Sequence, residues 1–378
     1  MMTEYHFEST GRCEIGGNHT DHQGGKVIAC AVDLTMDAYV APGGDSIEIN
    51  SEGHGSSFVS LDRLEPVPKE RGTTAALIRG IAAGFRRRGL KIGGFTGRII
   101  SHVPEGSGLS SSAAFEVLIS RILSGLYNGG KVDPVLAAQI CQEAENEYFG
   151  KPCGLMDQLA VSLGGMVYMD FSDSEAPETE EIDADLAGKG YLICVTDTKG
   201  SHADLTDEYA AVPAEMKKAA AFFGKDLLGQ VGKNEFYDAV AELREYAGDR
   251  AVLRGMHFFL ENERAEKEKE ALKSGNMQEF LRLFKESGES SRNYLQNIYA
   301  CRKDADYSLS LALAVSEQIL GDSGASRVHG GGFAGTIIAI VPEELKEKYI
   351  SGMDRLFGDG ACISLNIKKS CTLQSVSL

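Results

Sequence analysis

Apolar and polar residues in the first third of the chain follow two periods, one typical of strands and one typical of helices. Residues 26–40 (KVIACAVDLTMDAYV) and 46–50 (SIEIN) predict strands, joined by a Pro-Gly-Gly-Asp turn at 42–45. Residues 73–89 (TTAALIRGIAAGFRRRG) place apolar side chains at helical spacing, end in basic residues and close on a glycine, as an amphipathic helix does. Residues 95–101 (FTGRIIS) predict a further strand.

The clearest helix in the sequence is predicted within VDPVLAAQICQEAENEYFGKP, residues 132–152. Asp133 can cap its start and Pro134 suits its first turn, while Gly150 and Pro152 stop it. Apolar or small side chains recur on one face at every fourth position: Leu136, Ile140, Ala144 and Tyr148.

A change of composition follows this helix. Residues 166–171 (MVYMDF) predict a strand, and the next residues, 172–188, are acidic and weakly patterned. We expect a boundary between two domains in this stretch, with residues 1–180 before it and 181–378 after it.

The second half of the chain mixes strands and helices without a regular alternation. A buried strand is predicted at residues 191–198. A helix-rich region follows at 204–319, with interruptions near 248–255 and 287–293. Two last strands, at 336–341 and 361–367, lie on either side of a short helix. Because no βαβ repeat is present, the pattern favours an α+β fold over a doubly wound sheet.

Composition narrows the function classes. The chain has 378 residues, a formal net charge of −17, 43% hydrophobic and 25% charged residues, as an ordinary soluble globular protein has. It has no apolar run near the ~18 residues that span a bilayer, and its start lacks an export signal, so we expect a cytoplasmic protein. No basic stripe is present, which argues against a nucleic-acid partner. The eight cysteines form no C-x-x-C pair, so free thiols are expected rather than a zinc site or a disulfide framework.

The segment VPEGSGLSSSAAFEVLI, residues 103–119, combines glycines and serines at a helix start. Gly106 and Gly108 allow backbone angles that a Cβ forbids, and the serines at 110–112 precede an apolar helix face. Free amides and the positive end of the helix dipole form an anion site there, so the segment predicts a phosphate cradle. The alternative is that the serines are ordinary N-caps and the glycines ordinary turn residues.

Two other glycine motifs carry less weight. GLYNGGKV (125–132) has the Walker spacing, but Val132 stands where Ser or Thr must reach Mg²⁺, and no strand precedes it. RVHGGGFAG (327–335) contains G-x-G-x-x-G spacing, yet the sequence predicts neither the preceding strand nor the following acidic residue of a dinucleotide site.

Four segments in order resemble the galactokinases of the GHMP small-molecule kinase superfamily. They are the signature-like GRCEIGGNHTDHQGG, the loop PEGSGLSSSAA, the segment PCGLMDQLAVSLGG and the glycine run: residues 11–25, 104–114, 152–165 and 330–335. The resemblance extends over nearly the whole chain. It implies a two-domain GHMP kinase fold of the α+β class, with a ribosomal-protein-S5-like N-terminal domain and a C-terminal domain that contains a ferredoxin-like part. It also implies that ATP and a sugar meet between the two domains, and that the reaction gives galactose 1-phosphate.

Residue roles follow from the resemblance by position. Arg12 would stabilise charge at the transferring phosphoryl group, Asp157 would orient or deprotonate the anomeric hydroxyl, and Ser112 with Glu145 would hold Mg²⁺. The sugar site would comprise Asn18, His19, Asp21, Gly154 and Tyr209. The ATP loop would comprise Gly106, Ser107, Gly108, Leu109, Ser110, Ser111, Ser112 and Ala113.

Residues of these types suit phosphoryl transfer, because the reaction depends on in-line positioning and on compensation of negative charge more than on covalent catalysis by the protein. A carboxylate beside an arginine has a depressed pKa, so Asp157 is a poor base in isolation and both of its roles stay open. Each residue also has an ordinary reading: Asp157 as a helix cap, Arg12 as a surface pair, Glu145 as a solvated glutamate, and His19 and Tyr209 as structural polar residues.

The signature departs from the family pattern at three positions. Asn18 stands where a glutamate precedes the histidine of HTD, Glu14 where an asparagine follows GR, and His22 where a tyrosine follows HTD. Asn keeps an acceptor and adds donors but loses the charge. Two readings of Asn18 stay open: it accepts the same C6 hydroxyl, or it admits a sugar with a different group, such as galacturonate or N-acetylgalactosamine.

Three functions are therefore compared. The first is an ATP-dependent galactokinase or a kinase of a related hexose. The second is a galactokinase-like sensor that binds sugar and nucleotide and acts on a regulator. The third is another GHMP kinase, of mevalonate or homoserine, which the HTD and CGLMDQ segments disfavour.

Overall fold

The computed structural model describes residues 4–173, 175–200, 205–300 and 305–369, and the chain divides into two compact units. Unit 1 comprises residues 1–12, 30–165 and 367–378, and unit 2 comprises residues 13–29 and 166–366. A single boundary was expected at residue 180; among the described residues, 13–29 instead group with the later part of the chain and 367–369 with the earlier part. Weak patterning in one stretch does not reveal such an exchange of segments.

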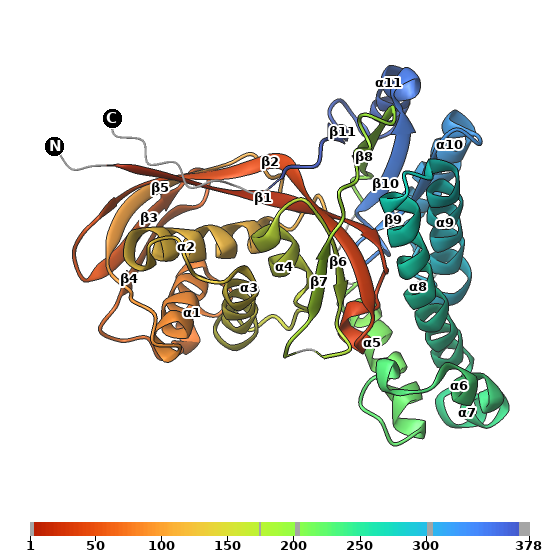
Figure 1. The fold of residues 1–378 in the computed structure, drawn as a ribbon, viewed down its shortest axis with the longest axis horizontal. Coiled ribbons are helices and arrows are strands. Elements are labelled where there is room, and N and C mark those ends of the chain that lie inside the picture. Colours follow the sequence, from red (N-terminus) through yellow and green to blue (C-terminus); the bar gives the residue numbers. More distant parts are fainter. Residues whose placement is uncertain (1–3, 174, 201–204, 301–304, 370–378) are drawn as a thin grey trace. The chain divides into compact units, whose positions relative to one another are not determined.

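Unit 1 contains most of a mixed sheet and a layer of helices (Figure 1). The strands of the sheet are β1 (Tyr5–Gly16), β2 (Lys26–Pro42), β3 (Ser46–Ser51), β4 (Gly55–Ser60), β5 (Phe95–Ser101), β6 (Met166–Asp170) and β7 (Glu178–Glu181). Their order is β4-β3-β5-β2-β6-β7, with β1 on β2; β6 and β7 belong to unit 2. β1 and β2 are long strands whose residues divide between the units.

The predicted strands on either side of the Pro-Gly-Gly-Asp turn exist, but they are not neighbours in the sheet. β5 lies between them, antiparallel to β2 and parallel to β3. Sequence pattern identifies strands but not which strand inserts between two others.

Four helices of unit 1 gather on one face of the sheet (Figure 1): α1 (Thr74–Arg87), α2 (Ser111–Asn128), α3 (Pro134–Glu143) and α4 (Met156–Leu163). The predicted cap of α3 is confirmed: Asp133 caps this helix, and Pro134 occupies its first turn. Thr73 caps α1, a contact that was not predicted from the sequence. After α3 a π-helical turn, η3 (Ala144–Phe149), carries the chain to Gly150, whose φ of 88° ends it. Single-turn π segments occur often at functional sites.

Unit 2 contains a four-stranded antiparallel sheet in the order β11-β8-β10-β9. Its strands are β8 (Tyr191–Asp197), β9 (Ala325–His329), β10 (Thr336–Pro342) and β11 (Cys362–Leu365). All seven residues of β10 are buried, as expected for an apolar strand with neighbours on both sides. The α+β class expected from the sequence is confirmed.

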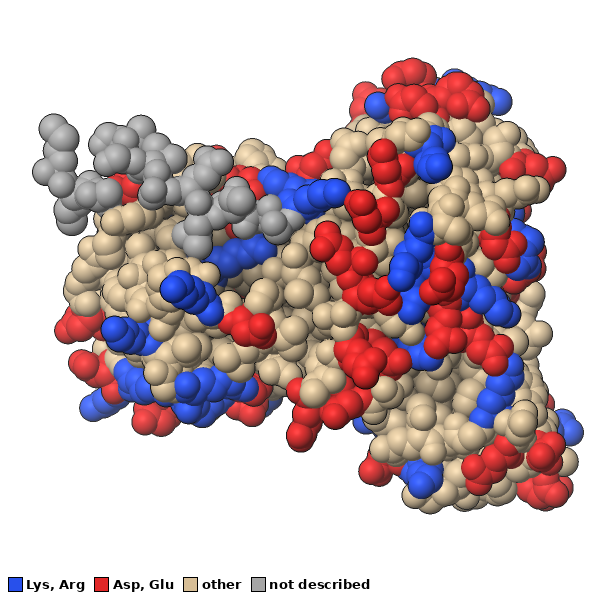
Figure 2. All heavy atoms as spheres, viewed as in Figure 1, with Lys and Arg blue, Asp and Glu red and all other residues tan. Residues whose placement is uncertain are grey.

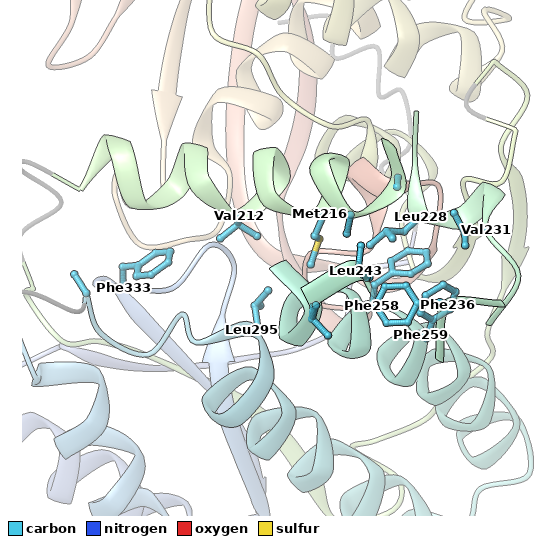
Figure 3. Close-up of a cluster of buried hydrophobic side chains, with 14 of the residues drawn as sticks. Val212, Met216, Leu228, Val231, Phe236, Leu243, Phe258, Phe259, Leu295 and Phe333 are labelled. Carbon is cyan, nitrogen blue, oxygen red and sulfur yellow. The ribbon is translucent and has the colours of Figure 1, made fainter. Parts of the chain in front are cut away.

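The helices of unit 2 are α5 (Thr206–Phe222), α6 (Lys233–Asp238), α7 (Val240–Ala247), α8 (Asp249–Lys273), α9 (Met277–Ser290), α10 (Ser308–Leu320) and α11 (Lys346–Phe357). The 3₁₀ turn η1 (Asp21–Gln23) and the π-helical turn η5 (Ser291–Leu295) complete the elements used below. Helices α5 to α8 enclose a core rich in phenylalanine, and Figure 3 shows Phe333 of the β9–β10 loop pointing into this cluster.

Two sequence expectations fail in unit 2. The predicted interruption at 287–293 is wrong, because α9 continues to Ser290 and passes directly into η5. Gly288 instead permits close packing, since a Cβ there would lie 3.1 Å from the Cβ of Arg327. The glycine run at 330–335 was expected to lack a preceding strand, but β9 leads straight into it. The run is nevertheless the turn of an antiparallel pair, not a strand-to-helix dinucleotide loop.

Acidic and basic side chains are interspersed on the face drawn in Figure 2. In unit 2 many of them pair, for example Arg282 with Glu279 at 2.7 Å and Lys269 with Glu180 at 3.2 Å. No described helix is both long and apolar enough to cross a bilayer. Cysteines 13, 30, 141, 153, 194 and 362 are free thiols, as expected, while Cys301 and Cys371 lie outside the described residues.

Candidate active site

A forked ion pair joins two residues that are 145 positions apart in the sequence. Arg12, on β1, donates from Nε to Oδ1 of Asp157 at 2.7 Å and from Nη2 to Oδ2 at 2.8 Å. Its third nitrogen, Nη1, donates to the carbonyl of Gly108. Asp157 lies in the first turn of α4, and no side chain caps that helix. The two predicted catalytic residues of unit 1 are therefore in direct contact, and Asp157 is not a helix cap.

Ser110 adds a third donor to the same carboxylate. Its hydroxyl donates to Oδ2 of Asp157, from a backbone held at φ 56° in the left-handed region. Burial by itself would raise the pKa of Asp157, but the charge and hydrogen bonds of Arg12, together with Ser110, outweigh it and hold this pKa below its usual value. Asp157 is thus an ionised acceptor at neutral pH, as the arginine neighbour predicted. Spacing alone gave no sign of the Ser110 contact.

The glycine-serine loop leaves a helix start open. Gly106 and Gly108 have φ of 70° and 72°, and Ser107 donates to the carbonyl of Pro104 at 2.6 Å. α2 begins at Ser111 with Ser110 as its N-cap residue, yet no side chain caps it. The ordinary reading of the serines as caps is therefore wrong for Ser110. The first amides of α2 have no side-chain acceptor and form the kind of helix end that binds anions.

A cavity of about 410 Å³ opens beside this helix start, within unit 1. Apolar side chains including Met36, Leu77 and Ile99 line it, together with the hydroxyl residues Ser111 and Ser112. Its size falls in the range of small-molecule sites. The sequence reading missed the apolar part, because its residues come from β2, α1 and β5.

Buried acids lie next to the predicted metal ligands. Glu145, in η3, is buried, and its Oε2 accepts from Nε2 of Gln158 at 2.9 Å. The same Nε2 donates to Oε2 of Glu116 at 3.0 Å, so one amide links two carboxylates. Burial and the charge of Glu145 raise the pKa of Glu116 well above its usual value. Glu116 was missed, although a glutamate inside the apolar run AAFEVLI was the signal for it.

These residues fit a hard divalent cation. Ser112 and Glu116 are four positions apart on α2 and share a face of the helix. Oε1 of Glu116 is buried without a hydrogen-bond partner, and carboxylate and hydroxyl oxygens are the donors that Mg²⁺ prefers. No hydrogen bond joins Ser112 to Glu145 in the described chain. No set of three or more His, Cys, Asp or Glu forms a metal site in the described residues, but Mg²⁺ bound mainly through phosphates needs only one or two carboxylates.

In unit 2 the HTD segment is held by a chain of hydrogen bonds that fixes the tautomers of two histidines. Nε2 of His19 lies 3.1 Å from the carbonyl of Gly331, which can only accept, so Nε2 carries the proton. Nδ1 of His19 then accepts from Nε2 of His22 at 3.2 Å, and Nδ1 of His22 accepts from Nε2 of Gln23 at 3.1 Å. Oε1 of Gln23 accepts from the amide of Leu228 at 3.3 Å, which orients the glutamine. Both imidazoles are neutral in this arrangement.

The pKa values agree with neutral rings. Burial lowers the pKa of His19, and chiefly burial lowers that of His22 to about 3. Burial also lowers the pKa of His257 to about 4, and its Nε2 donates to the carbonyl of Asn18 at 2.9 Å.

Asn18 is fully buried, and its amide is saturated by protein groups. Nδ2 donates to Oε1 of Glu14 at 2.9 Å and to the carbonyl of Gly330 at 2.8 Å. Oδ1 accepts from Nδ2 of Asn297 at 3.1 Å and from the hydroxyl of Ser291 at 3.3 Å. An amide has two donors and two acceptor sites, and all four are used here. Both readings of Asn18 as a sugar contact assumed an available amide.

Glu14 and Asn18, two of the three exchanged positions of the signature, therefore contact each other. Nη1 of Arg327 also donates to Oε1 of Glu14 at 3.0 Å, and Nη2 donates to the Glu14 carbonyl at 3.0 Å. The buried guanidinium on β9 thus has its countercharge on β1.

The remaining predicted sugar residues divide between the units. The hydroxyl of Tyr209 donates to the carbonyl of Gly332 at 2.7 Å, and its ring packs edge-on against Phe333. A Cβ at Gly331 would lie 2.7 Å from Cε1 of Tyr209, so this close approach requires glycine. Asp21 lies in η1 of unit 2 with His19. Gly154 lies in unit 1, in the loop before α4.

Comparisons with known proteins agree with this geometry. Residues 3–42 match the galactokinase galactose-binding signature and residues 76–165 match the GHMP kinases N terminal domain. A curated galactokinase of Glaesserella parasuis serovar 5 (strain SH0165) is 32% identical over 347 residues, which span 89% of this chain and 85% of that protein. The chain belongs to the galactokinase family.

Solved structures agree with the galactokinase fold. The galactokinase of Lactococcus lactis complexed with galactose gives a TM-score of 0.83 at 22% identity, covering 98% of this chain and 95% of that one. A mevalonate kinase of Methanococcus jannaschii gives 0.64 at 17% identity, covering 96% and 98%. The GHMP kinase fold expected from the sequence is confirmed.

Proposed function

We propose that this galactokinase-family protein transfers the γ-phosphoryl group of ATP to the anomeric hydroxyl of galactose, giving galactose 1-phosphate. One observation carries the proposal: the Arg12–Asp157 fork contacts Gly108 and Ser110 of an uncapped helix start. A charge-stabilising guanidinium, an oriented carboxylate and an anion site are the parts that phosphoryl transfer needs.

Asp157 orients the anomeric hydroxyl and accepts its proton late. The lowered pKa makes the carboxylate a weak base in the resting site, but three hydrogen bonds fix where its oxygens point. As the hydroxyl attacks, its acidity rises, so a weak base in a fixed position suffices. Arg12 both holds this carboxylate and supplies positive charge near the phosphate loop.

The triphosphate is proposed to bind at the amides of residues 110–113, with the base in the adjoining cavity. Ser112 and Glu145 would hold Mg²⁺, with Glu116 close to them. When bound, the ion would neutralise phosphate charge and orient the γ-phosphoryl group.

The hexose ligands are proposed to be Asp21, Gly154 and Tyr209, while His19, whose two ring nitrogens are both hydrogen-bonded to protein groups, is proposed to line the sugar site with its ring. Asn18 is assigned a different role, because its amide is saturated: it holds the HTD segment against the glycine run. The exchange at this position is then no reason to expect a uronate or an N-acetyl sugar.

An ADP-release assay with galactose, galacturonate and N-acetylgalactosamine tests the proposal. We expect turnover on galactose to exceed turnover on both analogues, and isotope labelling to place the phosphate on the anomeric oxygen. A strong preference for galacturonate would return Asn18 to the sugar site. Sugar binding by calorimetry without turnover on any sugar would favour a sensor.

A further inference from the structure

The side chain of Lys151 forms an ion pair with Glu145, the carboxylate that is proposed to bind Mg²⁺. Gly150 turns the chain at the end of η3, and the amides of Gly150 and Lys151 both donate to the carbonyl of Glu145, at 2.9 and 3.1 Å. The side chain then reaches back, and Nζ of Lys151 lies 3.0 Å from Oε1 of Glu145. The lysine side chain is 61% exposed and the glutamate side chain 4% exposed.

The carboxylate of Glu145 accepts hydrogen bonds from Gln158, from Lys151 and from the thiol of Cys153. Oε2 accepts from Gln158 and Oε1 from the Lys151 ammonium. The charge of the same ammonium also acts, more weakly, to lower the pKa of Glu116 and of Asp157. Arg12 is already committed to Asp157 through two hydrogen bonds. Lys151 is therefore the cation that compensates Glu145.

We propose that Lys151 is a built-in counterion that occupies the metal-binding oxygen of Glu145 and is displaced by the divalent cation. This inference rests on the metal role proposed for Glu145. A largely exposed ammonium on a flexible stem leaves an ion pair at little cost, whereas a divalent ion binds the same oxygen with twice the charge. The lysine keeps the buried acid compensated between turnovers and weakens metal binding to the nucleotide-free protein.

The test measures Mn²⁺ binding to the nucleotide-free protein by electron paramagnetic resonance, which needs no turnover. Lys151→Met should tighten Mn²⁺ binding about twofold to fivefold, within the range that loss of an exposed ion pair covers. Lys151→Arg should weaken it about threefold, because the forked guanidinium grips a carboxylate more firmly. Lys131→Met, an equal change of charge at another exposed lysine of unit 1, should leave it within about twofold.

The possible outcomes distinguish the counterion role of Lys151 from the metal role of Glu145. An affinity order of Met above Lys above Arg at position 151 supports the proposal. Equal affinity for all three side chains, or an equal gain in Lys131→Met, overturns it. Glu145→Gln should abolish Mn²⁺ binding at this site. Retained binding would show that Glu145 is not a metal ligand. The proposed phosphorylation of galactose is tested separately, by the ADP-release assay on the unaltered protein.

Discussion

The polar groups around the helix start at Ser111, in unit 1, and those around the HTD segment, in unit 2, are satisfied in opposite ways. In unit 1 the helix start at Ser111 has no cap, Glu116 has an oxygen without a partner, and a cavity adjoins both hydroxyls of Ser111 and Ser112. In unit 2 the HTD segment has its side chains bound to protein groups, through neutral rings at His19 and a saturated amide at Asn18.

The difference separates groups that can act on a ligand from groups that shape a binding surface. A buried donor or acceptor without a partner costs free energy in the protein without ligand. This cost is recovered when a ligand supplies the missing hydrogen-bond partner. A saturated network gives nothing to a ligand directly, but it fixes the backbone and the neighbouring side chains. We therefore expect substitutions in unit 1 to affect the chemical step and substitutions at Asn18 or His22 to affect stability first.

The largest expected effect is that of Asp157→Asn. Loss of the oriented negative charge should lower kcat about 10²- to 10⁴-fold, the range for removing an acid or base at a reacting group. The KM for galactose should change little, and circular dichroism should show an intact fold. The measurement is ADP release under saturating ATP and galactose.

Asp62→Asn removes an exposed carboxylate of unit 1 and serves as the matched control. Retention of kcat within about tenfold in Asp157→Asn would mean that Asp157 only anchors Arg12.

Asn18→Glu should mainly destabilise the protein. It would place a second carboxylate against Glu14 in a fully buried network, at a cost of about 3 kcal/mol in the free energy of unfolding. Glu14→Gln should cost a similar amount, because the buried Arg327 would lose its countercharge. Urea unfolding measures both.

The double variant Glu14→Gln/Asn18→Glu retains one carboxylate in the network, so its cost should be smaller than the sum of the two single costs. Additive costs would show that the two positions act independently, against the direct contact between them.

Ser101→Phe should weaken ATP binding about tenfold, because it adds a ring to the cavity of unit 1 without replacing a buried residue. Calorimetry with a non-hydrolysable ATP analogue measures the change. The Ser56→Phe variant, changed on β4 at a residue that does not line the cavity, should bind the analogue as the unaltered protein does. Equal loss in both variants would place the nucleotide base elsewhere.

The smallest expected effect concerns pH. Histidines titrate near 6.5 when unfolded, but the folded pKa is about 3 for His22 and about 4 for His257. Below pH 6.5 the unfolded chain therefore binds more protons, so stability is complete above about 6.5 and falls toward the folded values.

His22→Gln should make the free energy of unfolding less dependent on pH between pH 6 and 4. The slope should fall by the equivalent of up to about one bound proton, and urea unfolding midpoints at several pH values measure it. An unchanged slope would mean that His22 is protonated in the folded protein, contrary to its place in the hydrogen-bond chain.

The amino-acid sequence by itself determined the local elements and the identity of the chemistry. Alternation and helical spacing predicted β2, β5, α1 and α3, the cap Asp133 followed from residue type, and the order of motifs pointed to the family. These features depend on neighbours within a few positions, so a sequence carries them directly.

The tertiary structure decided which distant residues meet. It inserted β5 between β2 and β3, grouped residues 13–29 with the later part of the chain, and joined Asp157 to both Arg12 and Ser110. It also turned Asn18 away from a sugar contact, because Gly330 and Asn297 bind its amide from 312 and 279 positions away in the sequence. Hydrogen bonds between residues hundreds of positions apart exist only once the chain has closed on itself, and those bonds set which polar groups remain available for a substrate.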